Sequence, residues 1–385
     1  MQIGDRKIGI NHPPYIIAEI GVNHDGEVAR ALELTDAAAD AGADAVKLQF
    51  FETDRLMSKA AKLAAYQKNA GETDPIEMLK RLELTIDEMA LVVDRAHERG
   101  IHAIVTVFSM ELVEIAETLA WDAYKTASPD IVNRPLLEAL MATGKPMIVS
   151  TGASELDEVL RAVGWLDDAR DRLAVLQCVS CYPLEGVEHG LGGITQLREQ
   201  VCFPIGYSDH TKSHKTGKLA VAFGACILEK HITDNRHRKG PDHTASLLVA
   251  QLKGYIQLSC EGEAWSPDVD HAILHQVDKL GDGALVKDYA NAISHPHPAW
   301  DAIYAVSVNE SSKRVLDFER DVREVSRQSV VSVGEISSGT RITRDMLTIK
   351  RPGTGILAFE IDTVVGRVAT RAIEADVPIV EEDLE

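Results

Sequence analysis

Two histidines and a glutamate occupy positions that suit metal-dependent chemistry. Glu229 and His231 are two residues apart in a short apolar run, so a strand would direct both side chains to one face and Lys230 to the other. His210 ends the preceding apolar run, which would bring its imidazole beside that of His231 on neighbouring strands. Two neutral imidazoles near carboxylates can hold a divalent cation with open positions for a substrate. Two structural histidines bonded to the backbone would give the same pattern.

Charged and hydroxyl side chains recur where other apolar runs end. Lysines among them can form the locally positive pocket that an anionic substrate would need in an acidic protein. Any one of these residues alone is more often an ordinary surface group, but many of them converge if the runs are parallel strands. The residues are Glu19, Lys47, Gln49, Thr106, Lys125, Ser150, Tyr182 and Asp209.

The elements that must position these residues are predicted to be the strands of a closed barrel. Between residues 15 and 233, short apolar runs alternate with amphipathic helical stretches, which is the pattern of parallel βα units. Eight strands close a barrel whose active site lies at the carboxyl ends of the strands, and an open doubly wound sheet is the less favoured alternative. The predicted strands are 15–20, 45–50, 102–107, 123–126, 147–151, 174–179, 204–207 and 226–232.

Bulk composition indicates an acidic globular protein. The 385 residues are 45% hydrophobic and 26% charged, with a net charge of −20. This charge disfavours binding to nucleic acid or to an anionic membrane. The N-terminus lacks a signal-like apolar stretch and the five cysteines are sparse and odd in number, so we expect a cytoplasmic location. The pair Cys178 and Cys181 has redox or zinc spacing, but it lies at a strand end and lacks a second pair.

The chain past residue 250 follows a different pattern. We expect a barrel domain over residues 1–270, a linker with an inserted segment over 271–326, and a small β-rich domain over 327–385. Two runs in this last part, 331–334 and 364–368, are predicted as short strands beside turns.

Several motifs, taken together, resemble the N-acetylneuraminate (sialic acid) synthase family. Their order and spacing agree with that family over almost the whole chain, apart from roughly residues 270–326. The motifs are IAEIGVNHDG from Ile17, GADAVK from Gly42, GYSDHT from Gly206, EKH from Glu229 and GPDH from Gly240, with KRPGTG from Lys350 similar to the family's antifreeze-like SAF domain.

The resemblance implies a TIM barrel, that is a (β/α)₈ barrel, followed by a SAF domain. It implies a metal-dependent synthase that condenses phosphoenolpyruvate with N-acetylmannosamine, by C–O cleavage, to give N-acetylneuraminate and phosphate. The implied cofactor is Mn²⁺ or Mg²⁺, and the implied assembly is a domain-swapped homodimer. A synthase of the legionaminic or pseudaminic type, which uses another acetamido sugar, is the alternative. Barrel synthases of 3-deoxy sugar acids, which lack a SAF domain, and a catalytically silent sugar-binding protein fit less well.

Roles carry over to matching residues one at a time. His210 and His231 match the metal ligands, while Glu19, Lys47, Lys125 and Glu229 match catalytic positions. Positions around the substrates are matched by Gln49, Thr106, Phe108, Ser128, Ser150, Ser180, Tyr182, Ser208, Asp209, Asp242 and Arg351. Arg351 is expected to reach the barrel of the other subunit. The chain departs from the family pattern at Val107, Gln177, Val179 and Ser180, which we expect to line the sugar and phosphate region.

Overall fold

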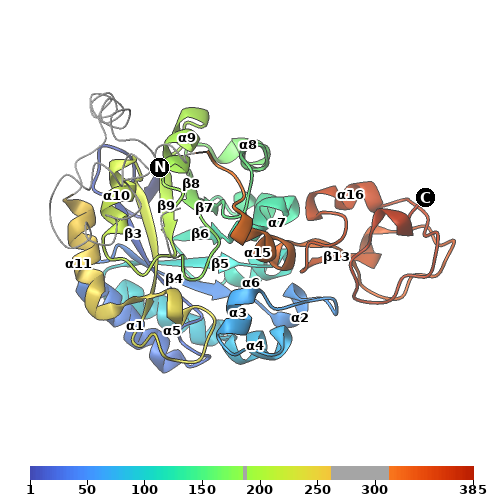
Figure 1. The fold of residues 1–385 in the computed structure, drawn as a ribbon, viewed down its shortest axis with the longest axis horizontal. Helices are drawn as coiled ribbons and strands as arrows, with labels where there is room; N and C mark the ends of the chain where they lie inside the picture. Colours follow the sequence, from blue (N-terminus) through green and yellow to red (C-terminus); the bar gives the residue numbers. More distant parts are fainter. Residues whose placement is uncertain (185–188, 262–311) are drawn as a thin grey trace, which may run out of the picture.

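The structure, a computed structural model, describes residues 1–184, 189–261 and 312–385 (Figure 1). Eight parallel strands form a closed barrel, because the last strand pairs with both the first and the seventh. Each predicted strand is present with its ends within two residues of the prediction. The barrel strands are β3 (Tyr15–Gly21), β4 (Ala45–Phe50), β5 (His102–Val107), β6 (Ala123–Thr126), β7 (Met147–Ser150), β8 (Leu173–Cys178), β9 (Ile205–Asp209) and β10 (Ile227–Thr233).

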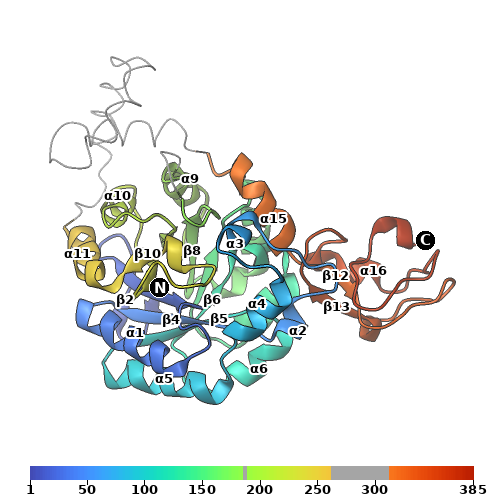
Figure 2. The ribbon, with the colours of Figure 1, turned by 60° about the horizontal axis from the view of Figure 1, so that its bottom comes forward.

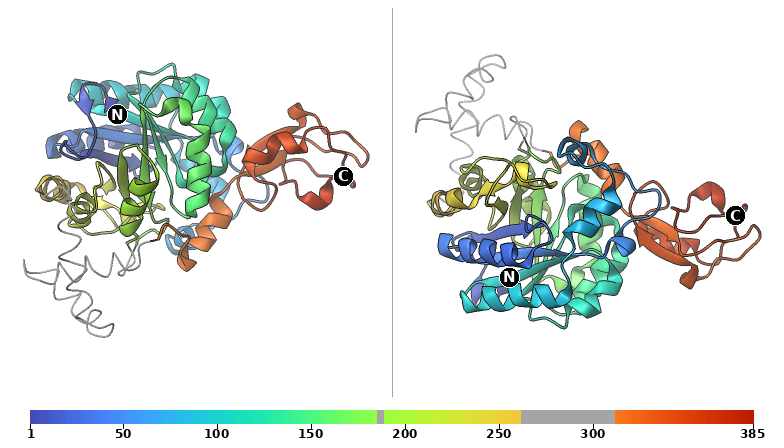
Figure 3. Two further views of the ribbon diagram at one scale, coloured as in Figure 1. Left: turned by 90° about the horizontal axis from the view of Figure 1, so that it is seen from above. Right: turned by 90° about the horizontal axis from the view of Figure 1, so that it is seen from below.

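Helices cover the outside of the barrel, as Figures 2 and 3 show. Outward strand residues such as Val46 and Val105 pack against helix residues such as Val92 in one large hydrophobic core. The helix α5 begins at the predicted capping box, in which Thr85 and Glu88 each bond the other's backbone amide. The covering helices are α1 (Val28–Ala41), α5 (Ile86–Glu98), α6 (Val113–Ala116), α7 (Arg134–Ala142), α8 (Leu156–Trp165), α9 (Gly192–Gln200), α10 (Thr216–Ala222) and α11 (Val249–Cys260).

A long excursion between β4 and α5 lies over the carboxyl ends of the strands. It contains α2 (Thr53–Leu56), α3 (Ala65–Asn69) and α4 (Pro75–Leu82), and in Figure 2 it lies beside the C-terminal part of the chain. Minor strands elsewhere are β1 (Gln2–Ile3), β2 (Arg6–Lys7) and β11 (Leu247–Leu248), the last of which pairs in parallel with the end of β10.

A small C-terminal domain has its own core and projects from the barrel (Figures 1 and 3). Its hairpin of β12 (Ser329–Ser332) and β13 (Leu347–Lys350) packs around Val330, Ile361 and Ile379. The predicted strand at 364–368 is wrong, because Val364 ends the short helix α16 (Ile361–Val364) and Val368 forms only an isolated bridge with Arg341.

The described part of the predicted linker is bound firmly to the barrel. We call residues 312–328 the crossing segment; it contains α15 (Arg320–Ser326), which lies between the two domains in Figure 1. Arg323 and Arg327 both bond Glu158 on α8 at 2.7–2.9 Å. Burial alone would raise the pKa of Glu158, but these two guanidinium groups lower it to about 2, so the contact stays ionised at neutral pH.

The predicted boundary at residue 270 lies outside the described residues. Within the described ranges, no helix is both long and apolar enough to cross a bilayer.

Candidate active site

One cavity at the carboxyl ends of the strands collects nearly all of the predicted site residues. It encloses about 930 Å³ of space, including open solvent at its mouth. The predicted residues that line it are Glu19, Lys47, Gln49, Thr106, Phe108, Lys125, Ser128, Ser150, Ser180, Tyr182, Ser208, His210, Glu229, His231, Asp242 and Arg351. The residues at the strand ends therefore meet in one cavity, as the sequence predicts.

Asp209 is the exception, and its predicted role in substrate binding is corrected. Side chains alternate along β9, so Ser208 and His210 face the cavity and Asp209 faces the helices. There its carboxylate lies 2.9 Å from the ammonium group of Lys230, and both side chains are fully buried. Because Lys230 points away while Glu229 and His231 line the cavity, the predicted alternation along β10 is confirmed.

Three of the four departures from the family pattern, Val107, Gln177 and Val179, also lie outside the cavity. Val107 belongs to the core between strands and helices, and Gln177 donates its amide to the carbonyl of Gly190. Only Ser180 among the departures lines the cavity. The expectation that Val107, Gln177 and Val179 line the sugar and phosphate region is therefore wrong.

Two lysines and two glutamates form a buried charge cluster at the base of the cavity. The Lys47 ammonium lies 2.6 Å from a Glu19 oxygen and 4.0 Å from Glu229, and it donates to the Thr106 hydroxyl at 2.9 Å. Lys125 lies 3.6 Å from the same Glu229 oxygen. All four residues are at most 5% exposed, so few water molecules screen these charges.

The two carboxylates of this cluster differ in protonation. Burial raises the pKa of Glu19 to about 7, with Glu229 adding to the rise and Lys47 opposing it. Burial would also raise the pKa of Glu229, but Lys125 and Lys47 outweigh it and lower the value to about 2. Burial lowers the pKa of Lys125, whereas Glu19 and Glu229 overcome burial and raise that of Lys47. The pair combines a permanently ionised carboxylate with one that titrates near neutrality.

This difference predicts a pH dependence that Glu19 controls. The carboxylate form of a group with pKa about 7 is lost as the pH falls, so the kcat/KM for the anionic substrate should decline about tenfold per pH unit below 7. The profile should be level just above pH 7. In Glu19→Gln this inflection should vanish, whereas an inflection that persists would belong to another titrating group.

Small residues allow polar groups to approach each other around the cluster. A side chain at Gly152 would clash with the hydroxyls of Ser180 and Ser128, which would lie 2.2 and 2.8 Å from its Cβ. In the structure the Gly152 amide donates to the Ser128 hydroxyl at 2.9 Å. With Lys125 lining the same cavity, the hydroxyl groups of Ser128 and Ser180 suit a phosphate or a carboxylate.

The two predicted metal ligands lie close together beneath Tyr182. The imidazole centroids of His210 and His231 are 5.6 Å apart, and the Tyr182 ring lies 4.0 Å from that of His210. Nδ1 of His210 is 2.7 Å from the carbonyl of Val179, which leaves Nε2 as the nitrogen able to coordinate. Nδ1 of His231 is buried without a hydrogen-bond partner and lies 3.7 Å from Asp242.

These observations fit a divalent cation with several open positions. The orphaned nitrogen of His231 and the oriented ring of His210 could supply two ligands. In the described part of the chain no three His, Cys, Asp or Glu side chains form a ready metal cage. Substrate and water would therefore complete the coordination.

Sequence reasoning missed one wall of the cavity. The excursion and neighbouring strand ends supply an apolar surface formed by Val22, Phe51, Leu56, Met78, Leu79, Leu82 and Phe108, which we call the apolar wall. Tyr66 of α3 adds an aromatic ring stacked on Tyr182 at 4.9 Å. The length of the excursion between β4 and α5 was the available signal, because long loops at this end of a barrel usually serve function.

The crossing segment also shapes the rim. Val322 and Ser326 line the cavity, and the buried Glu319 accepts the amides of Ala153 and Ser180 at 2.8 and 2.7 Å. Glu319 thereby joins the loops that follow β7 and β8.

Arg351 enters the cavity of its own chain. Its amide donates to the Leu56 carbonyl at 2.9 Å, and its carbonyl accepts from the Ser58 amide at 3.0 Å. The guanidinium carbon lies 5.4 Å from the Phe108 ring centroid, and burial lowers the pKa of this guanidinium. Arg351 therefore reaches the cavity within one chain, and the expected contact in trans stays a prediction.

An eight-stranded barrel with a buried lysine–carboxylate cluster at its carboxyl face defines an enzyme of the TIM-barrel class. The NeuB family profile matches residues 34–263, and the SAF domain profile matches residues 327–385. The chain belongs to the NeuB family, as the resemblance of its motifs implies.

Three of its relatives cover between 73% and 100% of the chain. An N,N'-diacetyllegionaminic acid synthase of Legionella pneumophila is 32% identical over 96% of this chain and 94% of its own. A spore coat polysaccharide biosynthesis protein of Bacillus subtilis has a crystal structure that matches with a TM-score of 0.77 at 26% identity, covering 100% of this chain and 99% of that one. An N-acetylneuraminic acid synthetase of Leptospira borgpetersenii matches with a TM-score of 0.61 at 30% identity, over 73% and 96% of the two chains.

Proposed function

We propose that this enzyme is a nonulosonic acid synthase that condenses phosphoenolpyruvate with an acetamido sugar and releases phosphate. The observation that carries the proposal is the buried cluster of Lys47, Lys125, Glu19 and Glu229 inside a protein of net charge −20. Phosphoenolpyruvate carries a carboxylate and a phosphate. The two lysines and the hydroxyl donors around Gly152 supply the local positive field that such an anion needs.

The residues of the cluster suit the steps of this condensation. When C3 of phosphoenolpyruvate attacks the sugar aldehyde, positive charge develops at C2, and the Glu19 carboxylate is the group that we propose to stabilise it. Water then adds at C2, and the tetrahedral intermediate collapses with cleavage of the C–O bond to phosphate. Glu229, ionised beside both lysines, holds their ammonium groups in place.

We propose that His210 and His231 hold the divalent cation, Mn²⁺ or Mg²⁺. When bound, the cation would act as a Lewis acid toward the sugar carbonyl. Exhaustive chelation should abolish turnover, and Mn²⁺ should restore it. In His231→Ala the same addition should restore little activity, and Mn²⁺ binding measured by calorimetry should weaken. Undiminished turnover after chelation would remove the cation from the mechanism.

The apolar wall bears on which sugar is the acceptor. The resemblance implies N-acetylmannosamine, which carries several hydroxyl groups, and any hydroxyl group buried against Met78, Leu79 and Leu82 would lack a hydrogen-bond partner. A diacetamido sugar with fewer hydroxyl groups would bury its methyl groups there, as the names of legionaminic acid synthases among the relatives also suggest. The wall therefore favours the diacetamido acceptor.

A sugar panel tests the proposed function. Purified protein is incubated with phosphoenolpyruvate, Mn²⁺ and one acetamido sugar at a time, and released phosphate is measured. We expect release with at least one sugar, and a higher kcat/KM with a diacetamido sugar than with N-acetylmannosamine. No release with any sugar would favour a silent sugar-binding protein.

A further inference from the structure

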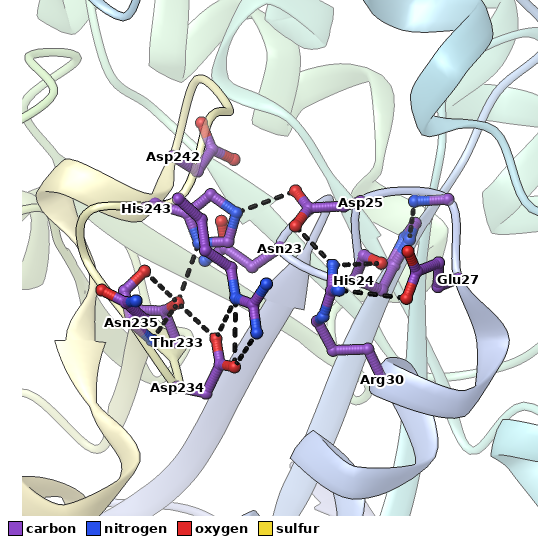
Figure 4. A network of polar contacts seen from close by, with 12 residues as sticks. Asn23, His24, Asp25, Glu27, Arg30, Thr233, Asp234, Asn235, Asp242 and His243 are labelled. Atoms are coloured by element: carbon purple, nitrogen blue, oxygen red, sulfur yellow. Dashed lines mark hydrogen bonds and ion pairs between the residues drawn. The ribbon is translucent and has the colours of Figure 1, made fainter.

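A buried polar network outside the cavity joins the loop after β3 to the loop that carries Asp242 (Figure 4). At its centre is His243, which is fully buried. Nε2 of His243 lies 2.8 Å from a carboxylate oxygen of Asp25, and Nδ1 lies 2.8 Å from the hydroxyl of Thr233. The other Asp25 oxygen is bonded by Arg30. These contacts link residues more than two hundred positions apart.

The hydroxyl–imidazole–carboxylate order of this network is that of a nucleophilic triad. Here, however, the hydroxyl is buried and lies away from the cavity. Thr233 is fully buried, and its hydroxyl already accepts the amide of Asn235 at 3.1 Å. None of Thr233, His243 and Asp25 lines the cavity of the candidate active site. A substrate could not reach this hydroxyl, so the network serves to hold structure.

The structure that it holds is the loop of Asp242. His243 is the next residue after Asp242, whose carboxylate lines the cavity beside His231. On the other side of this turn the Ser246 hydroxyl donates to the Asp242 carbonyl at 2.7 Å and accepts from the Asn23 amide at 2.8 Å. The loop that follows β3 is therefore hydrogen-bonded to the turn at two points, through Asp25 and Asn23.

Glycine at position 240 completes the arrangement. A Cβ at Gly240 would lie 2.8 Å from the His243 ring and 3.4 Å from an Asp25 oxygen. The residue before the Pro241–Asp242 segment must therefore be small if the imidazole is to reach Asp25. The glycine at position 240 and the Asp25–His243 hydrogen bond therefore favour the same conformation of this turn.

We propose that Asp25 and His243 are positioning residues that fix the Asp242 carboxylate toward the sugar. The inference rests on the proposed function, in which Lys47 and Lys125 contact phosphoenolpyruvate, and on the resemblance, which implies that Asp242 lies beside the sugar. Loss of the Asp25–His243 contact therefore weakens sugar binding and leaves phosphoenolpyruvate binding intact.

Separate Michaelis constants test the proposal. Asp25→Ala and His243→Ala should each raise the KM for the sugar about 10- to 100-fold, the usual size of effect for groups that orient a ligand-binding residue. The KM for phosphoenolpyruvate should change less than about twofold, because Lys47 and Lys125 keep their own hydrogen bonds to the Thr106 hydroxyl and the Thr126 carbonyl. Because both residues act through one contact, the double variant should be no worse than the poorer single variant.

The control is Arg238→Ala, which removes an exposed ion pair with Asp234 in the same loop. Exposed pairs contribute little, so both Michaelis constants should stay at the wild-type values. Equal rises of both constants in Asp25→Ala and His243→Ala, or no rise in either, would overturn the proposal. Should the alanine variants fail to fold, Asp25→Asn provides the same comparison with the shape of the side chain kept.

Amide hydrogen exchange gives a readout that does not require turnover. The amides of Ala245 and Ser246 donate to the carbonyls of Asp242 and His243. Their exchange should speed up at least tenfold in Asp25→Ala while the barrel strands keep the wild-type rates. Unchanged exchange at this turn would contradict the proposal even if no sugar is ever turned over, whereas faster exchange without any turnover would count only against the proposed function.

Discussion

Lys47→Met should lower kcat/KM for phosphoenolpyruvate about 10³-fold, because it removes a preorganised charge from a water-poor site. The Lys47 ammonium lies 2.6 Å from Glu19 and 4.0 Å from Glu229, so its loss also leaves two buried carboxylates without this partner. Glu19 can take up a proton to relieve the repulsion, since its pKa is already about 7. The carboxylate proposed to stabilise the reacting carbon would then be neutral as well. Steady-state kinetics at pH 7 measures the loss.

Lys145→Met is the matched control for this variant. The Lys145 ammonium pairs with Glu117 at 3.0 Å and has no place in the cavity lining. Its replacement should leave kcat/KM within about twofold of wild type, because exposed ion pairs contribute little. Circular dichroism must show that Lys47→Met is folded. Retention of more than a tenth of the wild-type kcat/KM by the folded variant would contradict the role given to Lys47.

Arg351→Ala should raise the KM for the sugar about 10- to 100-fold, which is the size expected when a buried charged donor is lost. The guanidinium lies in the cavity over Phe108, and its Nε is buried without a hydrogen-bond partner. This unsatisfied donor needs an acceptor, and a sugar oxygen is the one that we propose. Arg341→Ala, at an exposed site of the same domain, is the control, and its KM should be unchanged.

Mixing two impaired variants, assayed at a sugar concentration well below the KM of Arg351→Ala, tests which chain supplies Arg351. Lys125→Ala disables the cluster and Arg351→Ala disables the arginine. The structure places Arg351 in the cavity of its own chain, so every site in a mixed assembly keeps one defect and no activity should return. The domain-swapped homodimer that the resemblance implies gives another result. Half of the dimers would then be mixed, and one of the two sites in each mixed dimer would be intact, so about a quarter of the wild-type activity would return. Recovery of that size would show that the arm acts in trans.

The sequence sufficed for the barrel and for most of the cavity because both depend on local patterns. Alternation along a strand sets which side chains face inward, so Glu229 and His231 could be paired and Lys230 set apart. Parallel strands then bring their ends to one face, which is why residues as distant as Glu19 and Lys125 could be expected together. Asp209 was misplaced because the same alternation was not applied to the neighbour of His210.

The parts of the site that could not be predicted depend on contacts between segments that no local sequence pattern connects. Tyr66 stacks on Tyr182 from a short helix in the excursion, and nothing in the residues around Tyr66 predicts this partner. Glu158 and Arg327 are 169 positions apart, and Glu319 bonds an amide 139 positions away. Contacts of this length follow from how the crossing segment packs on the barrel, which periodicity and turn signals do not encode.

Isotope labelling of the leaving oxygen tests the central claim most directly. Phosphoenolpyruvate carrying ¹⁸O in the bridging position is incubated with the protein, Mn²⁺ and the acetamido sugar that supports turnover. We predict one labelled oxygen in the released phosphate, together with an unlabelled nine-carbon sugar acid, because the C–O bond breaks after water adds at C2. Label retained in the sugar acid, with unlabelled phosphate, would mean cleavage of the P–O bond and would contradict the mechanism built on the Glu19, Lys47, Lys125 and Glu229 cluster.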